Sequence, residues 1–252
     1  MRGTRKLFVV TALVVTAACA LPVAAQSRVA EYRASYEVSH KGRRAANAEF
    51  SVVAAGDAEY LYSSITEPRG LLKLLVPGPA TESSRLRLSA NRLQPIQFDY
   101  VDGSRKGEDN FSVAFDPAGG EVRITRAEGV ETLPFDQDLL DRGSLQVALL
   151  RDLANCSFPG PYRWVDDDGV KIYRYERLDD AEAKTAAGSF PTVRFSQQRE
   201  SSSRQSILWL APSLGFVPVY VEQIDNGETE TVYSLEDITI ITSQTAQCSG
   251  FR

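Results

Sequence analysis

The sequence contains few of the side chains that bind transition metals or carry acid–base chemistry. It has one histidine, three cysteines and one methionine. His40 alone cannot supply the several imidazole ligands of a typical zinc, copper or non-haem iron site. As a general base it would need a nucleophile and an orienting carboxylate, and the sequence selects neither. We therefore expect no metal, no cofactor and no catalytic role for His40, which is interpreted as a solvated turn residue.

Motifs that identify large enzyme families are also missing. The sequence has no Gly-x-Ser-x-Gly nucleophile elbow, no Walker A loop and no dinucleotide fingerprint. Basic residues are in the minority, with 28 Lys and Arg against 33 Asp and Glu, and the net charge is −5. A nucleic-acid-binding protein normally carries a basic stripe, so no nucleic-acid partner is expected. The composition, 43% hydrophobic and 24% charged, is that of an ordinary globular protein.

The first 25 residues have the layout of a cleavable secretory signal peptide. Three basic residues precede an apolar run over 7–21, and small residues occupy 23–25. The run is shorter than the roughly 20 residues that cross a bilayer. We therefore expect cleavage after Ala25 and a periplasmic protein with no transmembrane segment. Loss of the three basic residues would change the net charge from −5 to −8.

The cysteines bear on both the leader and the mature chain. Small residues before Cys19 resemble a bacterial lipobox, although Thr16 stands where Leu or Val is usual, so a lipoprotein at Cys19 is the less favoured alternative. After cleavage only Cys156 and Cys248 would remain. In an oxidising compartment these two are predicted to form a disulfide, which would close a loop of about 92 residues and contribute about 4 kcal/mol. A redox pair is less favoured because Cys-x-x-Cys is absent.

Period-two alternation dominates the chain from Tyr32 onward and predicts half-buried strands. Turn residues such as Asp102-Gly103 and Asn226-Gly227 separate the strands and accept the positive φ of tight hairpins. The pattern predicts a mainly β fold, an antiparallel meander that rolls into a barrel or a strongly curved sheet. No linker divides the sequence, so residues 26–252 are expected to form a single domain. The polar stretch 179–189 is interpreted as an exposed loop.

One segment, 138–153, has helical spacing instead. Its apolar residues include Leu139, Leu145 and Leu149, and they predict a short helical lid or plug for the curved sheet. Gly143 is expected to divide the segment into two short helices, and Ser144 is the predicted N-cap of the second one.

Acidic and hydroxyl clusters give weaker hypotheses. The run 166–168 of three aspartates suggests calcium, but it lacks the alternating spacing of an EF-hand loop and suits a turn. Asp136, Asp138 and Asp141 could gather a cation, although acids at a helix start are favoured by its dipole. The serines 201–203 are expected at a hairpin tip.

Aromatic residues alternate along many of the predicted strands. Ligand pockets are lined mainly by apolar and aromatic groups. An apolar cavity is therefore one interpretation, and a packed core is the other. The candidate ligand-binding residues are Tyr36, Tyr62, Phe98, Tyr100, Phe111, Tyr175 and Trp209.

Three stretches, 32–42 (YRASYEVSHKG), 64–71 (SITEPRGL) and 208–221 (LWLAPSLGFVPVYV), resemble the DUF3108 family of exported bacterial proteins without an assigned activity. The resemblance rests on scattered hydrophobic, Gly and Pro positions, and Ala45-Ala46 departs from it where a Gly is usual. It implies a fold similar to the incomplete β-barrel with an internal helical lid of the periplasmic lipoprotein carriers. It supplies no catalytic residues.

Together these observations favour a non-enzymatic exported protein that binds a hydrophobic or lipidic ligand inside a curved sheet. The first alternative is an envelope interaction or assembly module whose protein partner is unknown. The second is an envelope hydrolase with two carboxylates, whose separation the sequence does not reveal.

Overall fold

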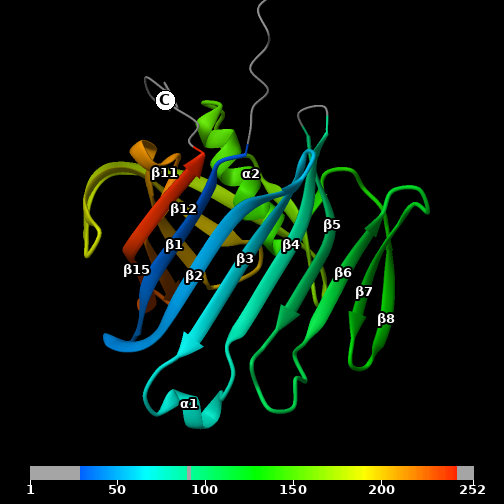
Figure 1. The fold of residues 1–252 in the computed structure, drawn as a ribbon, viewed down its shortest axis with the longest axis horizontal. Coiled ribbons are helices and arrows are strands. Elements are labelled where there is room, and N and C mark those ends of the chain that lie inside the picture. Colours follow the sequence, from blue (N-terminus) through cyan, green and yellow to red (C-terminus); the bar gives the residue numbers. More distant parts are fainter. Residues whose placement is uncertain (1–28, 90–91, 243–252) are drawn as a thin grey trace, which may run out of the picture.

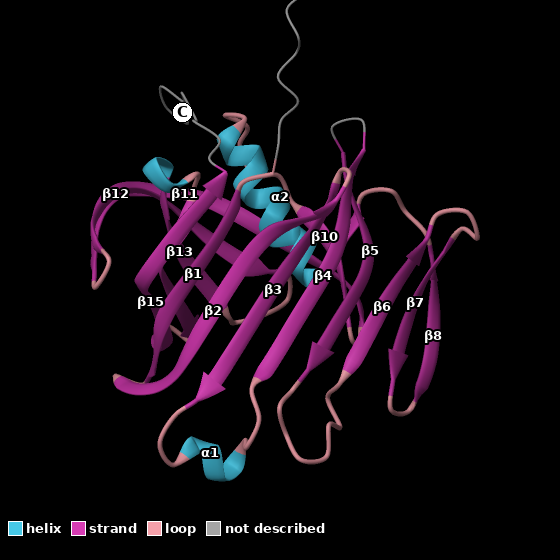
Figure 2. Cartoon of the chain, viewed as in Figure 1, coloured by secondary structure: helices cyan, strands magenta, loops and turns pink. Residues whose placement is uncertain are grey.

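The computed structural model describes residues 29–89 and 92–242, and the strands among them form one sheet of fifteen. The sheet curves around the helix α2 (Arg142–Ala154), as Figures 1 and 2 show. Two short helical turns, α1 (Leu72–Leu75) and η1 (Pro212–Leu214), lie between strands. The strands are β1 (Glu31–His40), β2 (Arg43–Gly56), β3 (Glu59–Pro68), β4 (Ala80–Ser89), β5 (Arg92–Val101), β6 (Phe111–Asp116), β7 (Glu121–Arg126), β8 (Gly129–Pro134), β9 (Leu139–Leu140), β10 (Tyr162–Asp166), β11 (Gly169–Thr185), β12 (Gly188–Arg199), β13 (Gln205–Ala211), β14 (Val217–Asp225) and β15 (Glu228–Thr242).

The order of strands in the sheet follows their order in the chain, with one exception. It runs β8-β7-β6-β5-β4-β3-β2-β1-β15-β14-β13-β12-β11-β10-β9, so β1 pairs with both β2 and β15. All neighbours are antiparallel except β9 and β10. The edges β8 and β9 do not pair, so the sheet is not closed. The predicted mainly β, antiparallel, incomplete barrel with one short helix is confirmed.

Antiparallel pairing places alternate turns at the same end of the sheet. The β1–β2, β5–β6, β12–β13 and β14–β15 turns share one end with α1, and we call this the lower end, as oriented in Figure 1. Glu31 pairs with Thr242 at the opposite, upper end. α2 lies on the concave side toward the upper end (Figure 2).

The start of α2 differs from the prediction. Asp141 is the N-cap: its side chain accepts a hydrogen bond from the Ser144 backbone N–H, and the Ser144 hydroxyl bonds to the Asp141 backbone. This reciprocal capping box satisfies donors that a helix start otherwise leaves free. The prediction of Ser144 as the N-cap of a second helix was therefore wrong: Leu139 and Leu140 pair as the strand β9, and a single helix begins after Asp141.

Gly143 does not divide the helix. It lies in the first turn of α2, where an added Cβ would meet the Ser84 Cβ and the Tyr62 Cδ1, each at 2.6 Å. The glycine therefore allows the helix to approach β3 and β4 closely. Its role is steric, and the predicted break was wrong.

The core consists of two clusters of buried side chains. The larger one contains Leu145, Leu149 and Leu153 of α2, packed among residues of the central and C-terminal strands such as Phe195 and Leu235. The smaller one joins β5–β7 to Leu139 and Val165 of β9 and β10. The second cluster therefore covers the gap where the sheet edges do not pair.

The stretch 179–189 is not a loop. It forms the end of β11 and the start of β12, paired from Ala181–Thr192 to Thr185–Gly188, with a register shift after Leu178. Ala183 is buried, although charged residues surround it in the sequence. The polar composition reflects an extended hairpin with one exposed face, which the prediction missed.

Several predictions concern residues outside the described ranges. The signal peptide 1–25, its cleavage after Ala25 and the lipidation of Cys19 all lie there. Cys248 lies there as well, so the Cys156–Cys248 disulfide stays a prediction. Cys156 itself follows Asn155, the C-cap of α2, and has a φ of 60°. Within the described ranges, no helix is long and apolar enough to cross a bilayer.

Candidate functional site

A cavity of about 720 Å³ lies between α2 and the concave face of the sheet. Its volume falls within the range of roughly 300–1,000 Å³ that is typical of small-molecule sites. The exposed residues Arg204 and Gln223, near the lower-end turns, belong to its lining, so the cavity opens at the lower end.

One wall of the cavity is aromatic and uncharged. Tyr36 and Phe50 pack edge to face with 5.3 Å between ring centroids, and Tyr233 lies 6.1 Å from Phe50. The Tyr36 hydroxyl donates a 2.7 Å hydrogen bond to the backbone oxygen of Pro218. Burial raises the pKa of Tyr36, Tyr62 and Tyr233, so these hydroxyls stay protonated at ordinary pH. This wall offers apolar surface with a few neutral hydroxyls.

The deep end of the cavity contains one charged cluster, centred on Arg142. Its guanidinium donates to Glu82 and to Asp166, each at 2.7 Å. It also lies 5.2 Å from the ring centroid of Tyr100 and 5.8 Å from that of Trp164. A cation in the first turn of a helix opposes the helix dipole, and the two carboxylates offset this cost. The cluster therefore joins α2, β4 and β10 through charge.

Arg199 differs from the other charged residues of the lining. Glu230 pairs with Lys41 at 3.3 Å and Asp225 with Arg204 at 3.6 Å, so both acids near the mouth have counter-ions. Among the described residues, Arg199 forms no ion pair, and it is half-buried in the cavity wall. The cavity thus combines an aromatic wall with a cation, Arg199, that forms no direct ion pair within the described residues, although its charge contributes to lowering the pKa of Asp168.

The structure brings three of the seven predicted ligand-binding residues to this cavity: Tyr36, Tyr62 and Tyr100. Phe98 and Phe111 instead pack in the smaller core cluster, because their strands cover the gap near β9. Tyr175 is buried in the larger cluster, and its hydroxyl accepts a 2.6 Å hydrogen bond from Nε2 of Gln197.

Trp209 lies on the opposite face of the sheet. Leu208 lines the cavity, and successive residues of a strand point to opposite faces. Trp209 therefore packs outside, with its ring 4.6 Å from the Arg194 guanidinium carbon and 5.7 Å from the Tyr220 ring. Because the run 207–210 is apolar throughout, its alternation gave no signal for the inward face.

The predicted lid residues pack in the hydrophobic core of the protein. Leu139 is buried in the smaller core cluster, and Leu145 and Leu149 are buried in the larger one. The face of α2 that reaches the cavity carries Arg142, Gln146 and Leu150.

The prediction missed Arg142, Trp164 and Arg199. Arg142 could have been noticed because it is a charged residue within the apolar segment 138–153. The alternation of Trp164 with Asp166 could have indicated an inward pair. Arg199 had no distinguishing signal in the sequence.

The weaker candidates are engaged in local contacts. In the run 166–168, Asp166 binds Arg142 and Asp168 binds Lys171 at 2.7 Å, although the three carboxylates come within 4.8 Å of one another. His40 is exposed, with its Nδ1 3.2 Å from Thr231 Oγ1. The serines 201–203 belong to the β12–β13 turn, as expected for a hairpin tip.

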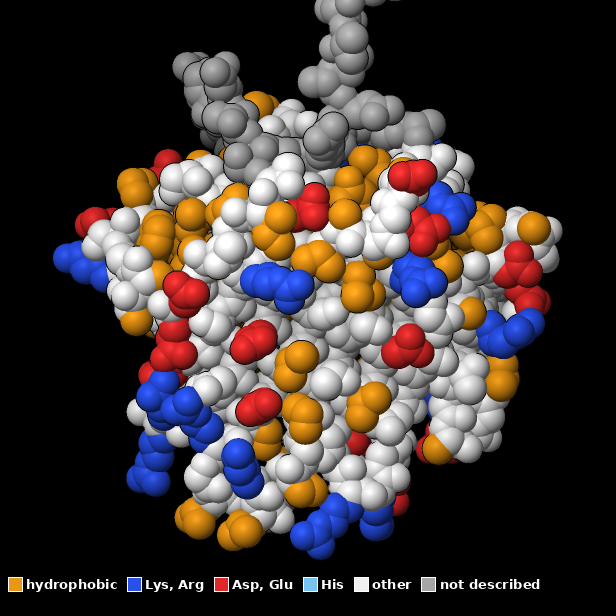
Figure 3. Space-filling view, in the orientation of Figure 1, with side chains coloured by type: hydrophobic (Ala, Val, Ile, Leu, Met, Phe, Trp, Pro, Cys, Tyr) orange, Lys and Arg blue, Asp and Glu red, His pale blue; other side chains and the backbone are white. Residues whose placement is uncertain are grey.

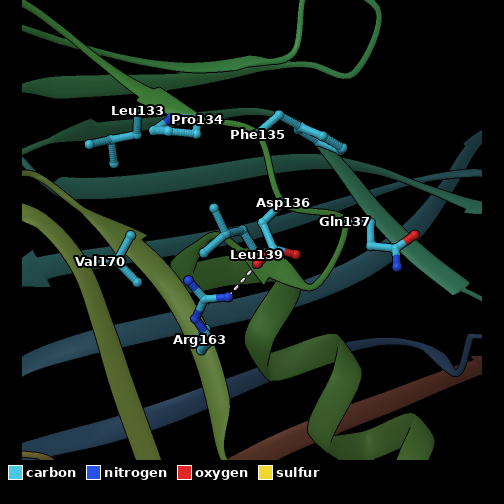
Figure 4. Close-up of a pocket in the computed structure, with 8 residues that line it drawn as sticks. All are labelled: Leu133, Pro134, Phe135, Asp136, Gln137, Leu139, Arg163 and Val170. Atoms are coloured by element: carbon cyan, nitrogen blue, oxygen red, sulfur yellow. Dashed lines mark hydrogen bonds and ion pairs between the residues drawn. The ribbon is translucent and has the colours of Figure 1, made fainter.

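The three predicted helix-start acids do not meet. Asp136 pairs with Arg163, Asp138 lies 3.5 Å from Arg92, and Asp141 caps α2. Backbone hydrogen bonding by Asp138, then the Arg163 guanidinium, lowers the pKa of Asp136. Asp136 and Arg163 also line a second, shallower depression of about 630 Å³, between the β8–β9 connection and β10–β11 (Figure 4). The two charges neutralise each other there, and Leu133, Phe135 and Val170 supply apolar surface.

Two of the acids that line the main cavity, Glu82 and Asp166, converge as the hydrolase alternative requires. Both bind the same guanidinium, however, and each therefore has an oxygen committed to Arg142. The shared ion pair with Arg142 is therefore enough to explain why these two acids lie close together.

Three solved structures from bacteria match this chain. A β-barrel-like protein of the domain of unknown function DUF1849 from Brucella abortus has a TM-score of 0.55 and 10% identity over 86% of this chain and 100% of that chain. A candidate exported protein of YmcC-like fold from Bacteroides fragilis has a TM-score of 0.37 and 12% identity, over 83% of this chain and 94% of that one. A candidate lipoprotein from Parabacteroides distasonis has a TM-score of 0.37 and 10% identity, over 83% and 95%.

At such identities the first of these structures supports the fold alone. No match was found among curated proteins. The model of the DUF3108 family, described as proteins of unknown function, matches residues 31–233. The resemblance noted in the sequence is confirmed, and the chain belongs to the DUF3108 family.

Proposed function

We propose that this protein is a non-enzymatic carrier or sensor in the bacterial envelope that binds an amphiphilic, lipid-like ligand in the cavity beneath α2. The supporting observation is the composition of the cavity, which has an aromatic wall along β1, β2 and β15 and an unpaired cation, Arg199. An acyl chain would lie against the tyrosines and Phe50. An anionic head group would lie near Arg199, because a half-buried guanidinium binds carboxylate or phosphate strongly.

The two tryptophans allow a direct test, since they are the only two in the chain. Trp164 lines the cavity and is 3% exposed, whereas Trp209 lies on the outer face. The variant Trp209→Phe leaves Trp164 as the only tryptophan, and Trp164→Phe leaves Trp209. Titration with a fatty acid brominated in mid-chain should quench Trp164 saturably and leave Trp209 unchanged. Equal quenching of both, or of neither, would contradict binding in the cavity.

Native mass spectrometry supplies an independent measurement. Protein purified from its host envelope should carry a bound amphiphile, or take one up in a 1:1 ratio. A protein that stays empty with fatty acids and phospholipids alike would rule out the proposal. N-terminal mass spectrometry of the same sample would test export, and a diacylated Cys19 would replace the soluble form with a lipoprotein.

The alternative of an assembly module has one supporting feature, the edge strand β8. Val130 on this strand is 60% exposed, and β8 has no partner on its outer side among the described strands. The strand has only six residues and ends at Pro134, however, and both features hinder pairing with another chain. We therefore favour ligand binding.

A further inference from the structure

Exposed apolar side chains gather at the lower end of the molecule. The segment 69–79, between β3 and β4, contains α1 and carries Leu71, Leu72 and Leu74, whose exposed fractions are 83%, 41% and 73%. Ile65 and Val101 extend this surface, because both pair with Thr81 in the sheet and are 38% and 44% exposed. Of nine exposed large hydrophobic residues in the described chain, five therefore lie here. We call these five residues the leucine edge.

Cations without counter-ions surround the leucine edge. Arg69 and Lys73 are exposed, and residues 69–79 include no acid. Arg43, the first residue of β2, and Arg105, in the β5–β6 turn, are also exposed. Among the described residues, none of these four forms an ion pair. In Figure 3 basic side chains lie beside hydrophobic ones along the lower end. The positive charge of residues 69–79 contrasts with the net charge of −5 for the chain, whereas the β5–β6 turn also carries the acids Asp102, Glu108 and Asp109.

The segment that presents the leucines is held in place. The Arg69 N–H donates to the Ala45 oxygen at 2.7 Å, and the Gly78 N–H donates to the Gly103 oxygen at 3.0 Å. An added Cβ at Gly103 would lie 2.5 Å from the Gly78 oxygen, so the two loops are in close contact. The leucines are therefore displayed by an anchored element, and the loop contacts bring Arg43 and Arg105 to the same side.

We propose that the leucine edge and its four cations form a docking site for a lipid bilayer with anionic head groups. Leucines beside lysine and arginine suit the membrane interface, where apolar side chains enter the acyl boundary and cations meet phosphate. Clustered basic residues strengthen binding to anionic membranes. Thr66 and Ala80, at the two roots of this segment, line the cavity. Docking would therefore place the cavity mouth against the bilayer, and this last step rests on the proposed ligand binding.

Vesicle flotation tests the site. The exported form, purified from the envelope with its N terminus identified, is mixed with vesicles of phosphatidylglycerol and phosphatidylcholine, or of phosphatidylcholine alone. We expect binding to the anionic vesicles that falls at least tenfold in the double variant Leu71→Ser/Leu74→Ser. The variant Arg69→Gln/Lys73→Gln should weaken binding several-fold and reduce its dependence on salt.

A matched control distinguishes docking through this site from nonspecific adsorption through any exposed apolar side chain. Phe158 and Ile241 are 51% and 49% exposed and lie elsewhere, so Phe158→Ser/Ile241→Ser should bind vesicles as the wild type does. Equal loss in this control, or full binding by the leucine variant, would overturn the proposal. A circular dichroism spectrum and melting temperature like the wild type's would show that the leucine variant is folded.

A second copy of the chain is the competing occupant. Analytical ultracentrifugation without lipid would detect a dimer that the leucine variant abolishes, and that result would overturn the membrane assignment. Bromo-fatty-acid quenching of Trp164 in solution measures cavity binding without a bilayer. The two assays are therefore independent: membrane docking can fail while ligand binding in the cavity is observed, and ligand binding can fail while membrane docking is observed.

Discussion

The Ser84 hydroxyl of β4 donates a 2.9 Å hydrogen bond to Oδ2 of Asp141, the residue that caps α2. Both side chains are fully buried. The bond fixes the helix start against the sheet directly beside Arg142. Asp141 therefore helps to position Arg142 at the deep end of the cavity, where Arg142 pairs with Glu82 and Asp166.

Asp141 should make the protein more stable in mild acid. Burial raises the pKa of its carboxyl from the ordinary value of an aspartate to about 6, against opposing hydrogen bonds from Ser144 and Ser84. The folded state thus binds a proton that the unfolded state has lost, so stability decreases as pH rises between about 4 and 6. The shift of about two pKa units corresponds to about 3 kcal/mol. In Asp141→Asn, which keeps an oxygen for the cap, this dependence should disappear from urea melts at pH 4, 5, 6 and 7. If the free energy of unfolding of the variant changed with pH as that of the wild type does, other titratable groups would cause the pH dependence.

Gly143→Ala should destabilise the protein although alanine favours helices. The new methyl group would meet side chains of β3 and β4 at 2.6 Å, and overpacking of this kind costs about 1–3 kcal/mol. Gly160→Ala is the matched control, because its Cβ would have no neighbour within 4 Å. Urea denaturation of both variants measures the difference. Equal stability of the two would mean that α2 can shift away from the sheet.

Arg142→Met should leave Glu82 and Asp166 without their shared cation. Breaking a partly buried pair costs more than breaking a surface pair, and we expect a loss of about 2 kcal/mol in the free energy of unfolding. Arg92→Met is the control: its pair with Asp138 spans 3.5 Å, with side chains 45% and 69% exposed, and its loss should cost under about 0.5 kcal/mol. If the Arg142→Met variant were as stable as the control, the ion pairs of Arg142 would not stabilise the deep end of the cavity.

Arg199→Gln should lower affinity for an anionic amphiphile at least tenfold and leave the melting temperature unchanged, because the residue has no ion pair to lose among the described residues. Arg33→Gln is the matched control on the outer face, next to the inward Tyr32. Titration of Trp164 fluorescence with a brominated fatty acid and with its alcohol analogue measures both affinities. The alcohol should bind the Arg199→Gln variant and the wild type alike. A similar loss of affinity for the fatty acid and for the alcohol would show that Arg199 contributes through packing and not through its charge.

Local patterns sufficed for the strands and several turns. The alternation from Tyr32 to Val38 corresponds to inward residues of β1, and Asn226-Gly227 forms the β14–β15 turn with φ of 49° and 83°. Such features depend on a few neighbouring residues. The apolar spacing of 138–153 likewise predicted the one longer helix. Alternation alone could not distinguish a closed barrel from an open curved sheet, and the family resemblance favoured the incomplete barrel.

The site was less accessible to sequence reasoning because it is assembled from distant segments. Glu82, Arg142 and Asp166 meet only after β4, α2 and β10 have packed together, and no local spacing encodes their contact. Trp209 was placed on the wrong face because its neighbours Leu208 and Leu210 are equally apolar. Ser144 was taken for a cap because Gly143 was expected to break the helix, and the close approach of β3 and β4 that requires this glycine is a long-range contact.

The pairing of β1 with β15 has a consequence for how the chain is completed. Glu31 and Thr242 are hydrogen-bonded partners separated by 211 residues, and their strands lie at the centre of the sheet, not at its edge. Strands β2–β8 can pair in order as they emerge, but one side of β1 stays open until the last strand arrives. Contacts of such long sequence separation slow folding. A chain stopped before residue 228 would expose a central strand, so its synthesis or translocation must finish before the sheet is protected from other chains.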